Sequence, residues 1–195
     1  MKTHLDLSLP RCTWCTDDET YRAYHDYEWG ELIQDDALLF EFVLLEGAQA
    51  GLNWLTILKR REAYRLAFDG FNPHIIAQYS EDKLEALMQD PGIIRNRAKI
   101  KSAVTNAKAF LNLVQDFGSF YTYTMRFFPG NKPLIQIPEK NSDIPVQNEI
   151  SIAMSKDMKK RGFTFFGPVI CYAHLQATGA INDHLKTCFK SPSSL

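Results

Sequence analysis

Apolar residues recur at intervals of three and four along most of this chain. That spacing places them on one face of an α-helix. It predicts helices over residues 36–51, 53–70, 80–90, 93–118, 146–162 and 168–181. Ser80 and the acidic residues after it are typical of a helix N-terminus, and Gly70 and Gly118 predict helix ends.

The segments between these helices carry few strand signals. Residues 119–128 are aromatic enough for a strand, although Tyr121, Met125 and Phe128 also fit one helical face. A polar stretch marked by prolines, residues 129–145, predicts a loop. We find no internal repeat. The predicted fold class is therefore all-α, in a single domain over residues 1–195.

Composition fits an ordinary globular protein, with 45% hydrophobic and 23% charged residues in 195. No apolar run approaches the roughly 20 residues that span a bilayer. The first ten residues lack the apolar centre of a signal peptide, so we expect a cytoplasmic protein that does not bind membranes.

A net charge of −1 argues against a strongly basic nucleic-acid-binding protein, but it leaves room for local patches. Three basic patches occur, at residues 59–62, 95–101 and 156–161. Each alone is more typical of a solvated helix face than of a phosphate site. Lys160 and Arg161 in the last patch fit either a DNA phosphate contact or a helix end in water.

A carboxylate stands out in the stretch LLEGAQAGLNW, residues 44–54. Glu46 follows an apolar run and precedes four small residues and Trp54. A glutamate in such a run must reach water or meet a partner. Two interpretations stay open: a helix end facing solvent, or a small pocket with a carboxylate on one wall and an aromatic ring on the other.

Cysteine and histidine pairs lie at both ends of the chain. Cys12 and His25 are thirteen residues apart, and His184 and Cys188 are four apart, a spacing that places both on one helical face. Two cysteines and two histidines would give zinc a closed tetrahedral shell. The pairs could equally be unrelated, and Cys15 is a rival ligand. We expect the fourth cysteine, at position 171, to be a buried small hydrophobe.

A Pro-Gly turn joins two predicted helices in LMQDPGIIRNRAKI, residues 87–100. Backbone N–H groups after Pro91 and Gly92 would face an anion such as a DNA phosphate. Arg95, Arg97, Lys99 and Lys101 follow directly. The segment resembles the helix-hairpin-helix motif of DNA repair proteins.

Several further segments share one resemblance. YHDYEWG, LLEGAQAGLNW, GIIRNRAKI, KKRGFTFFGPVICYAHLQATG and NDH occur in the order and spacing of the 3-methyladenine DNA glycosylase I family, the Tag-type bacterial enzymes of the helix-hairpin-helix superfamily. The resemblance covers residues 11–188. It implies a helix-hairpin-helix glycosylase fold and a monofunctional enzyme of base excision repair, which flips 3-methyladenine out of alkylated double-stranded DNA and hydrolyses its N-glycosidic bond. Free 3-methyladenine would be the product, and we expect a monomer.

The resemblance also assigns roles to residues. Glu46 matches the family's base-recognising glutamate and is the predicted catalytic residue. The predicted base pocket adds Trp54, Tyr24, Tyr21, Trp14 and Trp29, although tryptophans and tyrosines at helical spacing are often core residues. Predicted DNA contacts are Gln49, Gly51, Leu52, Gly92, Ile93, Arg95 and Arg97. One structural zinc ion would be held by Cys12, His25, His184 and Cys188, and would join the terminal segments 11–30 and 167–188.

One expected group is missing. The wider superfamily places a catalytic aspartate about twenty residues beyond the hairpin, but the surroundings of Asp116 do not match that pattern, and the Tag-type family lacks the aspartate. We expect Asp116 to be an exposed helix-end residue. Methylation at N3 makes the base cationic, so it leaves as a neutral molecule and needs no general acid.

Two other functions remain to be weighed. A DNA-binding module that has lost excision would lack the pocket glutamate or tryptophan, and both Glu46 and Trp54 are present. A zinc hydrolase would need an open coordination position and a nearby acid or base. The four candidate zinc ligands lie far from Glu46 in the sequence, which argues against a zinc hydrolase.

Overall fold

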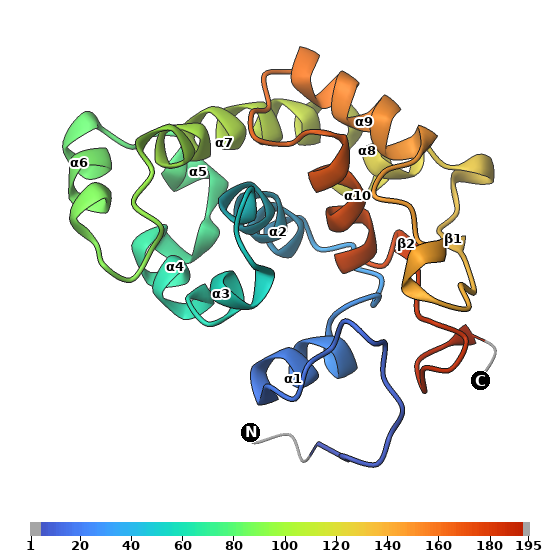
Figure 1. The fold of residues 1–195 in the computed structure, drawn as a ribbon. Helices are drawn as coiled ribbons and strands as arrows, with labels where there is room; N and C mark the ends of the chain where they lie inside the picture. Colours follow the sequence, from blue (N-terminus) through green and yellow to red (C-terminus); the bar gives the residue numbers. More distant parts are fainter. Residues whose placement is uncertain (1–4, 193–195) are drawn as a thin grey trace.

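The computed structural model describes residues 5–192, and this part of the chain is mainly helical (Figure 1). Its α-helices are α1 Glu19–Tyr27, α2 Asp36–Gln49, α3 Trp54–Leu58, α4 Arg61–Ala67, α5 Pro73–Ile76, α6 Glu81–Gln89, α7 Arg97–Phe117, α8 Phe120–Met125, α9 Glu149–Lys160 and α10 Pro168–Ala177. The predicted all-α class is confirmed in this mainly helical form. No helix within residues 5–192 is long and apolar enough to cross a membrane.

Helix α2 lies at the centre of the molecule, with α3 to α7 on one side and α8 to α10 on the other (Figure 1). It buries an unbroken run from Leu39 to Ala48. A helix that is apolar around most of its circumference must be covered on all sides. Phe40 at its middle packs on Phe110 of α7, with ring centroids 4.9 Å apart. This central position surrounds the Glu46 side chain with protein.

Local chemistry explains where several helices begin. Ser80 caps α6 as predicted, because its hydroxyl accepts a hydrogen bond from the Lys83 N–H. The long helix expected from residue 93 begins instead at Arg97, since Asn96 is its N-cap and the hairpin turn extends to that residue. Residues 119–128 are not a strand: Ser119 caps the short helix α8.

The single helix predicted over residues 53–70 is broken into α3 and α4. The break falls at Lys59 and Arg60, so the two short helices can bend around α2. Gly70, the predicted helix end, adopts a positive φ of 67° in a 3₁₀ turn.

A small parallel ladder adds the one sheet within residues 5–192. Strand β1, Leu134–Ile135, pairs with β2, Ile181–Asn182, with Leu134 opposite Ile181. The ladder fastens the loop predicted at 129–145 to the segment that follows α10. The described ends of the chain also meet, because Phe189 N–H donates to the Pro10 carbonyl at 2.8 Å. Sequence-distant residues are thereby gathered beside α1.

Candidate functional site

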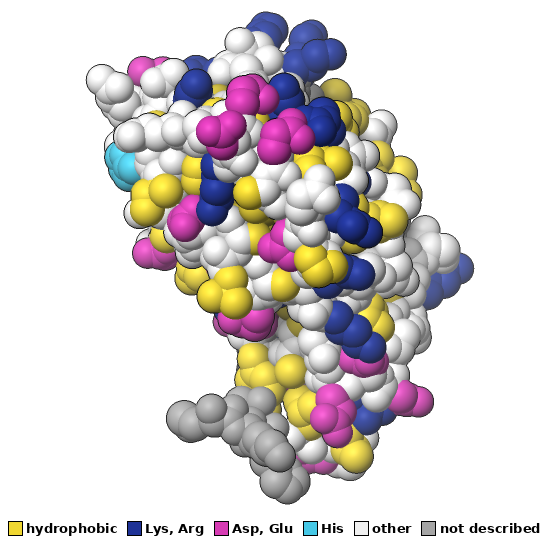
Figure 2. Space-filling model, turned by 90° about the vertical axis from the view of Figure 1, so that its left-hand side faces the viewer, with side chains coloured by type: hydrophobic (Ala, Val, Ile, Leu, Met, Phe, Trp, Pro, Cys, Tyr) yellow, Lys and Arg dark blue, Asp and Glu magenta, His cyan; other side chains and the backbone are white. Residues whose placement is uncertain are grey.

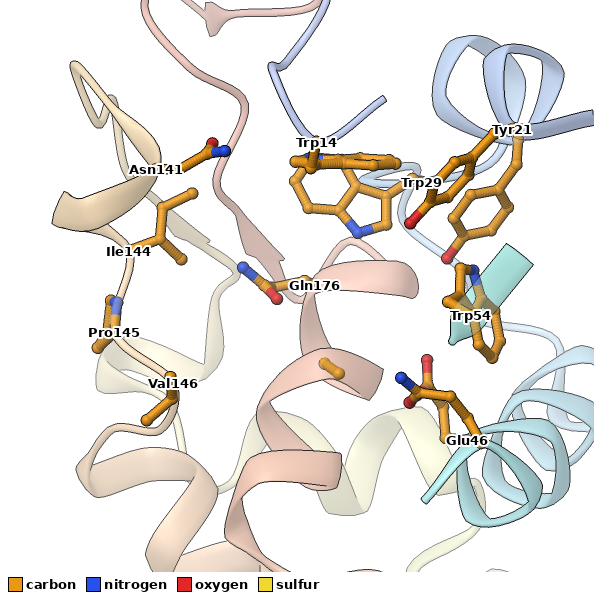
Figure 3. A pocket seen from close by; sticks show the side chains of 13 residues that line it. Trp14, Tyr21, Trp29, Glu46, Trp54, Asn141, Ile144, Pro145, Val146 and Gln176 are labelled. Carbon is orange, nitrogen blue, oxygen red and sulfur yellow. The ribbon is translucent and has the colours of Figure 1, made fainter. Parts of the chain in front are cut away.

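A cavity of about 300 Å³ opens between α1, the end of α2 and α10. We call it the aromatic pocket. Five aromatic side chains line it: Trp14, Tyr21, Tyr24, Trp29 and Trp54. Figure 3 shows the four that it labels, Trp14, Tyr21, Trp29 and Trp54, on one side of the pocket. The structure therefore brings together all six residues that were predicted to form a base pocket, since Glu46 also lines this cavity.

Glu46 is nearly inaccessible to water, with 3% of its surface exposed. Its Oε2 atom has no hydrogen-bond partner among the described residues. Burial raises the pKa of this carboxyl to about 8, because no group nearby offsets the loss of solvent. The Nε1 donor of Trp54, which lines the same cavity, is buried and has no partner among the described residues either. Orphaned polar atoms in one cavity indicate a site completed by a ligand.

The aromatic rings hold each other in place. Trp14 packs against Tyr21 and Trp29 with ring centroids 5.1 and 5.0 Å apart, and Tyr24 packs against Trp54 at 5.7 Å. Burial raises the pKa of Tyr24 well above its usual value, and nearby Glu46 adds to the shift. The Tyr24 hydroxyl is therefore protonated at neutral pH. Such a wall offers flat ring faces that suit a planar, positively charged ligand.

The opposite side of the pocket was not predicted. It is lined by Ala173 and Gln176 of α10 and by Asn141, Ile144, Pro145 and Val146 (Figure 3). Gln176 is fixed there because its Nε2 donates to the buried carboxylate of Asp183 at 2.7 Å. The only sequence signal for this side was indirect: Gln176 lies in the motif KKRGFTFFGPVICYAHLQATG, which is part of the family resemblance. The loop residues carry no sequence signal, because the local sequence does not show that this polar loop will fold over α10.

The second constellation is a buried cluster of Cys12, His25, His184 and Cys188, whose candidate ligand atoms all lie within 4.8 Å of one another. We call it the Cys–His cluster. A tetrahedral zinc shell implies S···N separations of about 3.6 Å. The cluster has Cys12 Sγ and Cys188 Sγ at 3.5 and 3.6 Å from His184 Nδ1, and Cys188 Sγ at 3.4 Å from His25 Nε2. The residues fit such an ion.

The outer nitrogens of both histidines are also paired. His25 Nδ1 lies 2.9 Å from Asp26 Oδ1, and His184 Nε2 lies 3.2 Å from the Trp29 carbonyl oxygen. These contacts fix which ring nitrogen faces the cluster, as is usual for histidine ligands. Gly30 is required here, because a Cβ atom at its φ of 83° would come within 2.8 Å of His184 Nε2.

Two expectations about the cysteines are settled by this geometry. Cys15 is half-buried and does not belong to the cluster, so it is not the rival ligand among the described residues. Cys171 is fully buried, as expected. The expectation that His184 and Cys188 share a helical face is wrong, because residues 183–188 are irregular, with a turn at 186–187, rather than helical. The backbone turn still brings both side chains to one point.

Three of the residues predicted to contact DNA lie at the end of α2 and in the loop after it. Gly51 has a φ of 79° and open space around its α-carbon, and Leu52 is 40% exposed. Gln49, the last residue of α2, lines the aromatic pocket, and its Nε2 donates to the Leu52 carbonyl at 3.3 Å. Lys99 of α7 closes the end of α2, because its Nζ donates to the carbonyls of Ala48 and Ala50 at 2.9 and 2.6 Å.

The hairpin between α6 and α7 accounts for the other predicted DNA contacts. Gly92 packs so closely that a Cβ atom would lie 2.9 Å from the Ala63 side chain. Ile93 is 3% exposed, so a DNA contact there would involve its backbone N–H, the group predicted to face a phosphate at this turn. Arg95 is exposed, whereas Arg97 forms an ion pair with Glu85. Lys and Arg side chains gather along one part of the molecular face that carries α4 and α6 (Figure 2).

Asp116 and Arg161 bind each other rather than the pocket. Arg161 Nη1 lies 3.1 Å from Asp116 Oδ2, and its Nε donates to Asp157 at 2.8 Å. The guanidinium also stacks over Phe117 at 4.6 Å. Asp116 is thus an exposed helix-end residue as expected, and Arg161 is held by intramolecular partners.

Comparisons with known proteins cover nearly the whole chain, including the aromatic pocket. The sequence profile of a family described as methyladenine glycosylase matches residues 14–191. DNA-3-methyladenine glycosylase 1 of Escherichia coli K12 is 43% identical over 95% of this chain and 99% of its own, and the Haemophilus influenzae DNA-3-methyladenine glycosylase is 44% identical over 91% and 96%. A crystal structure of 3-methyladenine DNA glycosylase I superimposes with a TM-score of 0.90 at 43% identity, covering 94% of this chain and 100% of that one. A variant of 3-methyladenine DNA glycosylase I in complex with 3-methyladenine gives 0.88 at 37%, covering 95% and 97%.

Proposed function

The chain belongs to the methyladenine glycosylase family, and we propose that it is a DNA-3-methyladenine glycosylase, a hydrolase that releases 3-methyladenine from alkylated DNA. The observation that carries this proposal is the buried, unpartnered carboxylate of Glu46 in a pocket walled by aromatic rings. A DNA-binding module that had lost excision activity would not need to keep that carboxylate buried away from water.

The chemistry of the substrate matches the pocket. A base methylated at N3 carries a positive charge, which a desolvated carboxylate and aromatic faces both favour. Entry of that cation would lower the raised pKa of Glu46, so the carboxylate ionises opposite the base and accepts hydrogen bonds from its edge. An uncharged adenine would leave the carboxyl without that compensation, which gives selectivity for the damaged base.

The reaction needs little acid–base chemistry from the protein. Water adds to the sugar C1′, the C1′–N9 bond breaks, and its electron pair neutralises the departing cationic base. The proton from the water is released to solvent. Glu46 and the rings hold the base, so positioning rather than a general acid supplies the rate.

The size of the aromatic pocket suits one base and not a duplex. At about 300 Å³ it can take a nucleobase only after the nucleotide has rotated out of the helix. We propose that Gly51 and exposed Leu52 fill the vacated stack. The helix-hairpin-helix segment, residues 87–100, would bind the phosphate backbone through the Ile93 N–H and Arg95.

We further propose that the Cys–His cluster holds one structural zinc ion. Bound there, the ion would cross-link the terminal segments 11–30 and 167–188 of a single domain spanning residues 1–195. All four ligands come from protein and are buried, so the shell is closed and offers no position for a reacting water. This arrangement argues against a zinc hydrolase. We propose a monomer that works in the cytoplasm, where the DNA lies.

The decisive experiment measures base release from methylated duplex DNA by wild type and by Glu46→Gln, with products separated by chromatography. We expect free 3-methyladenine from the wild type and a loss of at least about 100-fold in the variant. Thermal unfolding curves must show that both proteins are fully folded at the assay temperature for the comparison to count. If neither releases a base while wild type binds DNA, the chain is a binding module instead.

A further inference from the structure

A second concave surface lies between the end of α9 and the start of α10, and no predicted residue role covers it. It encloses about 720 Å³ and is lined by Lys156 and Lys159 of α9 and by residues 162–168. We call it the α9–α10 groove. Unlike the aromatic pocket, it contains an exposed aromatic side chain, Phe165, and two cations.

Phe165 is held in an unusual position. Its φ of 54° lies in the left-handed region that side chains other than glycine rarely adopt, yet 39% of its surface is exposed. The buried amide of Asn106 holds the preceding residue at both ends: Thr164 N–H donates to Oδ1 at 2.8 Å and Nδ2 donates to the Thr164 carbonyl at 3.1 Å. A strained residue persists only where its surroundings fix it.

The groove adjoins the elements that carry the proposed DNA contacts. Gly47, the neighbour of Glu46 on α2, packs against Phe165: a Cβ atom there would lie 3.6 Å from the Phe165 carbonyl oxygen. Asn106 belongs to α7, the helix that follows the hairpin. The connection between α9 and α10 thus lies against both α2 and α7 (Figure 1).

The lysines of the groove differ from the neighbouring Arg161 in whether their charges are paired. Lys156 and Lys159 are exposed, sit three residues apart on α9, and form no ion pair with any described residue. Arg161, which follows, is neutralised by Asp157 and Asp116. Two unpaired cations beside an apolar ring match the charge and shape of a nucleic-acid backbone, where phosphates alternate with apolar sugar faces.

We propose that the α9–α10 groove is a second DNA-binding surface, which holds the duplex beside the flipped nucleotide. Lys156 and Lys159 bind two phosphates, and Phe165 packs against the sugars between them. This inference rests on the proposed function, since it takes the substrate to be DNA. It favours two lysines that line the groove over Arg161, whose guanidinium is paired with Asp157 and Asp116, and over Lys160, which is exposed but does not line the groove.

The test compares the double variant Lys156→Gln/Lys159→Gln with a control of equal charge, Lys108→Gln/Lys132→Gln, whose lysines are exposed and lie outside the groove. Affinity for a duplex with a non-cleavable abasic analogue is measured over a salt series. We expect the slope of log K against log[salt] to weaken by about 2 in the groove variant, because about 0.9 of slope is lost per phosphate contact. The control should keep the wild-type slope.

Phe165→Asn tests the ring separately, because asparagine tolerates the left-handed backbone and keeps the fold. We expect weaker binding of DNA by about 5- to 20-fold with an unchanged salt slope, since packing carries no charge. Quenching of tryptophan fluorescence by free 3-methyladenine should equal that of wild type, because the aromatic pocket is intact.

Failure of this inference and failure of the proposed function give different results. Groove variants that bind DNA with the control's slope and affinity overturn the inference, even if wild type releases 3-methyladenine. Absence of base release by wild type overturns the proposed function, whereas a weakened slope in the groove variant would still support DNA contact there.

Discussion

The aromatic pocket and the Cys–His cluster are both buried and polar, and they share the rings of Trp14 and Trp29, yet their polar atoms are paired differently. In the cluster, both histidines have a partner for each ring nitrogen. In the pocket, Glu46 Oε2 and Trp54 Nε1 have none among the described residues. A fully paired polar group stabilises a fold, whereas an unpaired one costs stability until a ligand arrives.

The shared rings show how close these two regions are. Trp29 packs edge-on against His184 with centroids 4.6 Å apart, and Trp14 lies 5.2 Å from His25. The cluster therefore supports the pocket wall from behind. Substitutions in the cluster should reduce stability first, and substitutions in the pocket should reduce activity first.

The largest expected effect is in the cluster. Cys188→Ser, or removal of the metal with a chelator, should lower the free energy of unfolding by at least about 4 kcal/mol, because a bound structural ion contributes directly to folding. In a protein of this size that corresponds to a fall in melting temperature of about 10 °C or more. Calorimetry together with metal analysis measures both quantities.

Cys15→Ser is the control, since it removes a thiol that lies near Cys12 in the N-terminal segment but outside the cluster. It should change the free energy of unfolding by less than about 0.5 kcal/mol. A chelated protein that keeps its melting temperature but loses all base release would reverse the assignment and make the metal catalytic.

Glu46→Gln should show the opposite pattern to the cluster variants. Base release should fall by at least about 100-fold, equivalent to about 3 kcal/mol. Thermal stability should stay equal or rise, because a neutral amide is less costly to bury than a carboxylate that can ionise. A melting temperature that falls with activity would mean that Glu46 has a structural partner.

The pH dependence of stability should carry the signature of Glu46. Its pKa rises from 4.5 in the unfolded chain to about 8 in the folded protein, so between these values only the folded state holds the proton. The free energy of unfolding should therefore fall as pH rises, by up to about 1.4 kcal/mol per unit. Urea titrations should show this slope in wild type and not in Glu46→Gln; parallel curves would contradict it.

The smallest effect should come from Lys99, which closes the end of α2 next to the pocket. Lys99→Met keeps the aliphatic stem but removes the hydrogen bonds to Ala48 and Ala50, and should lower the free energy of unfolding by about 1–2 kcal/mol. Lys101→Met is the control, because that lysine has only an exposed ion pair with Glu81. Equal effects of the two would show that the contacts of Lys99 with α2 contribute nothing.

Local patterns determined most of the helices and the identity of the chemical groups. Apolar spacing places α2, α6, α9 and α10 within a few residues of their observed bounds, and Ser80 marks the start of α6. These features depend on neighbours within one or two helical turns. The order and spacing of the family's motifs indicate the family, and the resemblance also points to the four residues of the Cys–His cluster.

Tertiary structure decided everything that depends on contacts between distant segments. Gln176 and the loop at Asn141 reach the pocket only because α10 lies opposite the N-terminal aromatic residues and β1 pairs with β2 after α10. Ile93 is buried and Arg161 is paired because other helices supply their partners. Whether a polar group is free or bound depends on atoms far away along the chain, so the sequence named Glu46 but only the fold left its carboxylate without a partner.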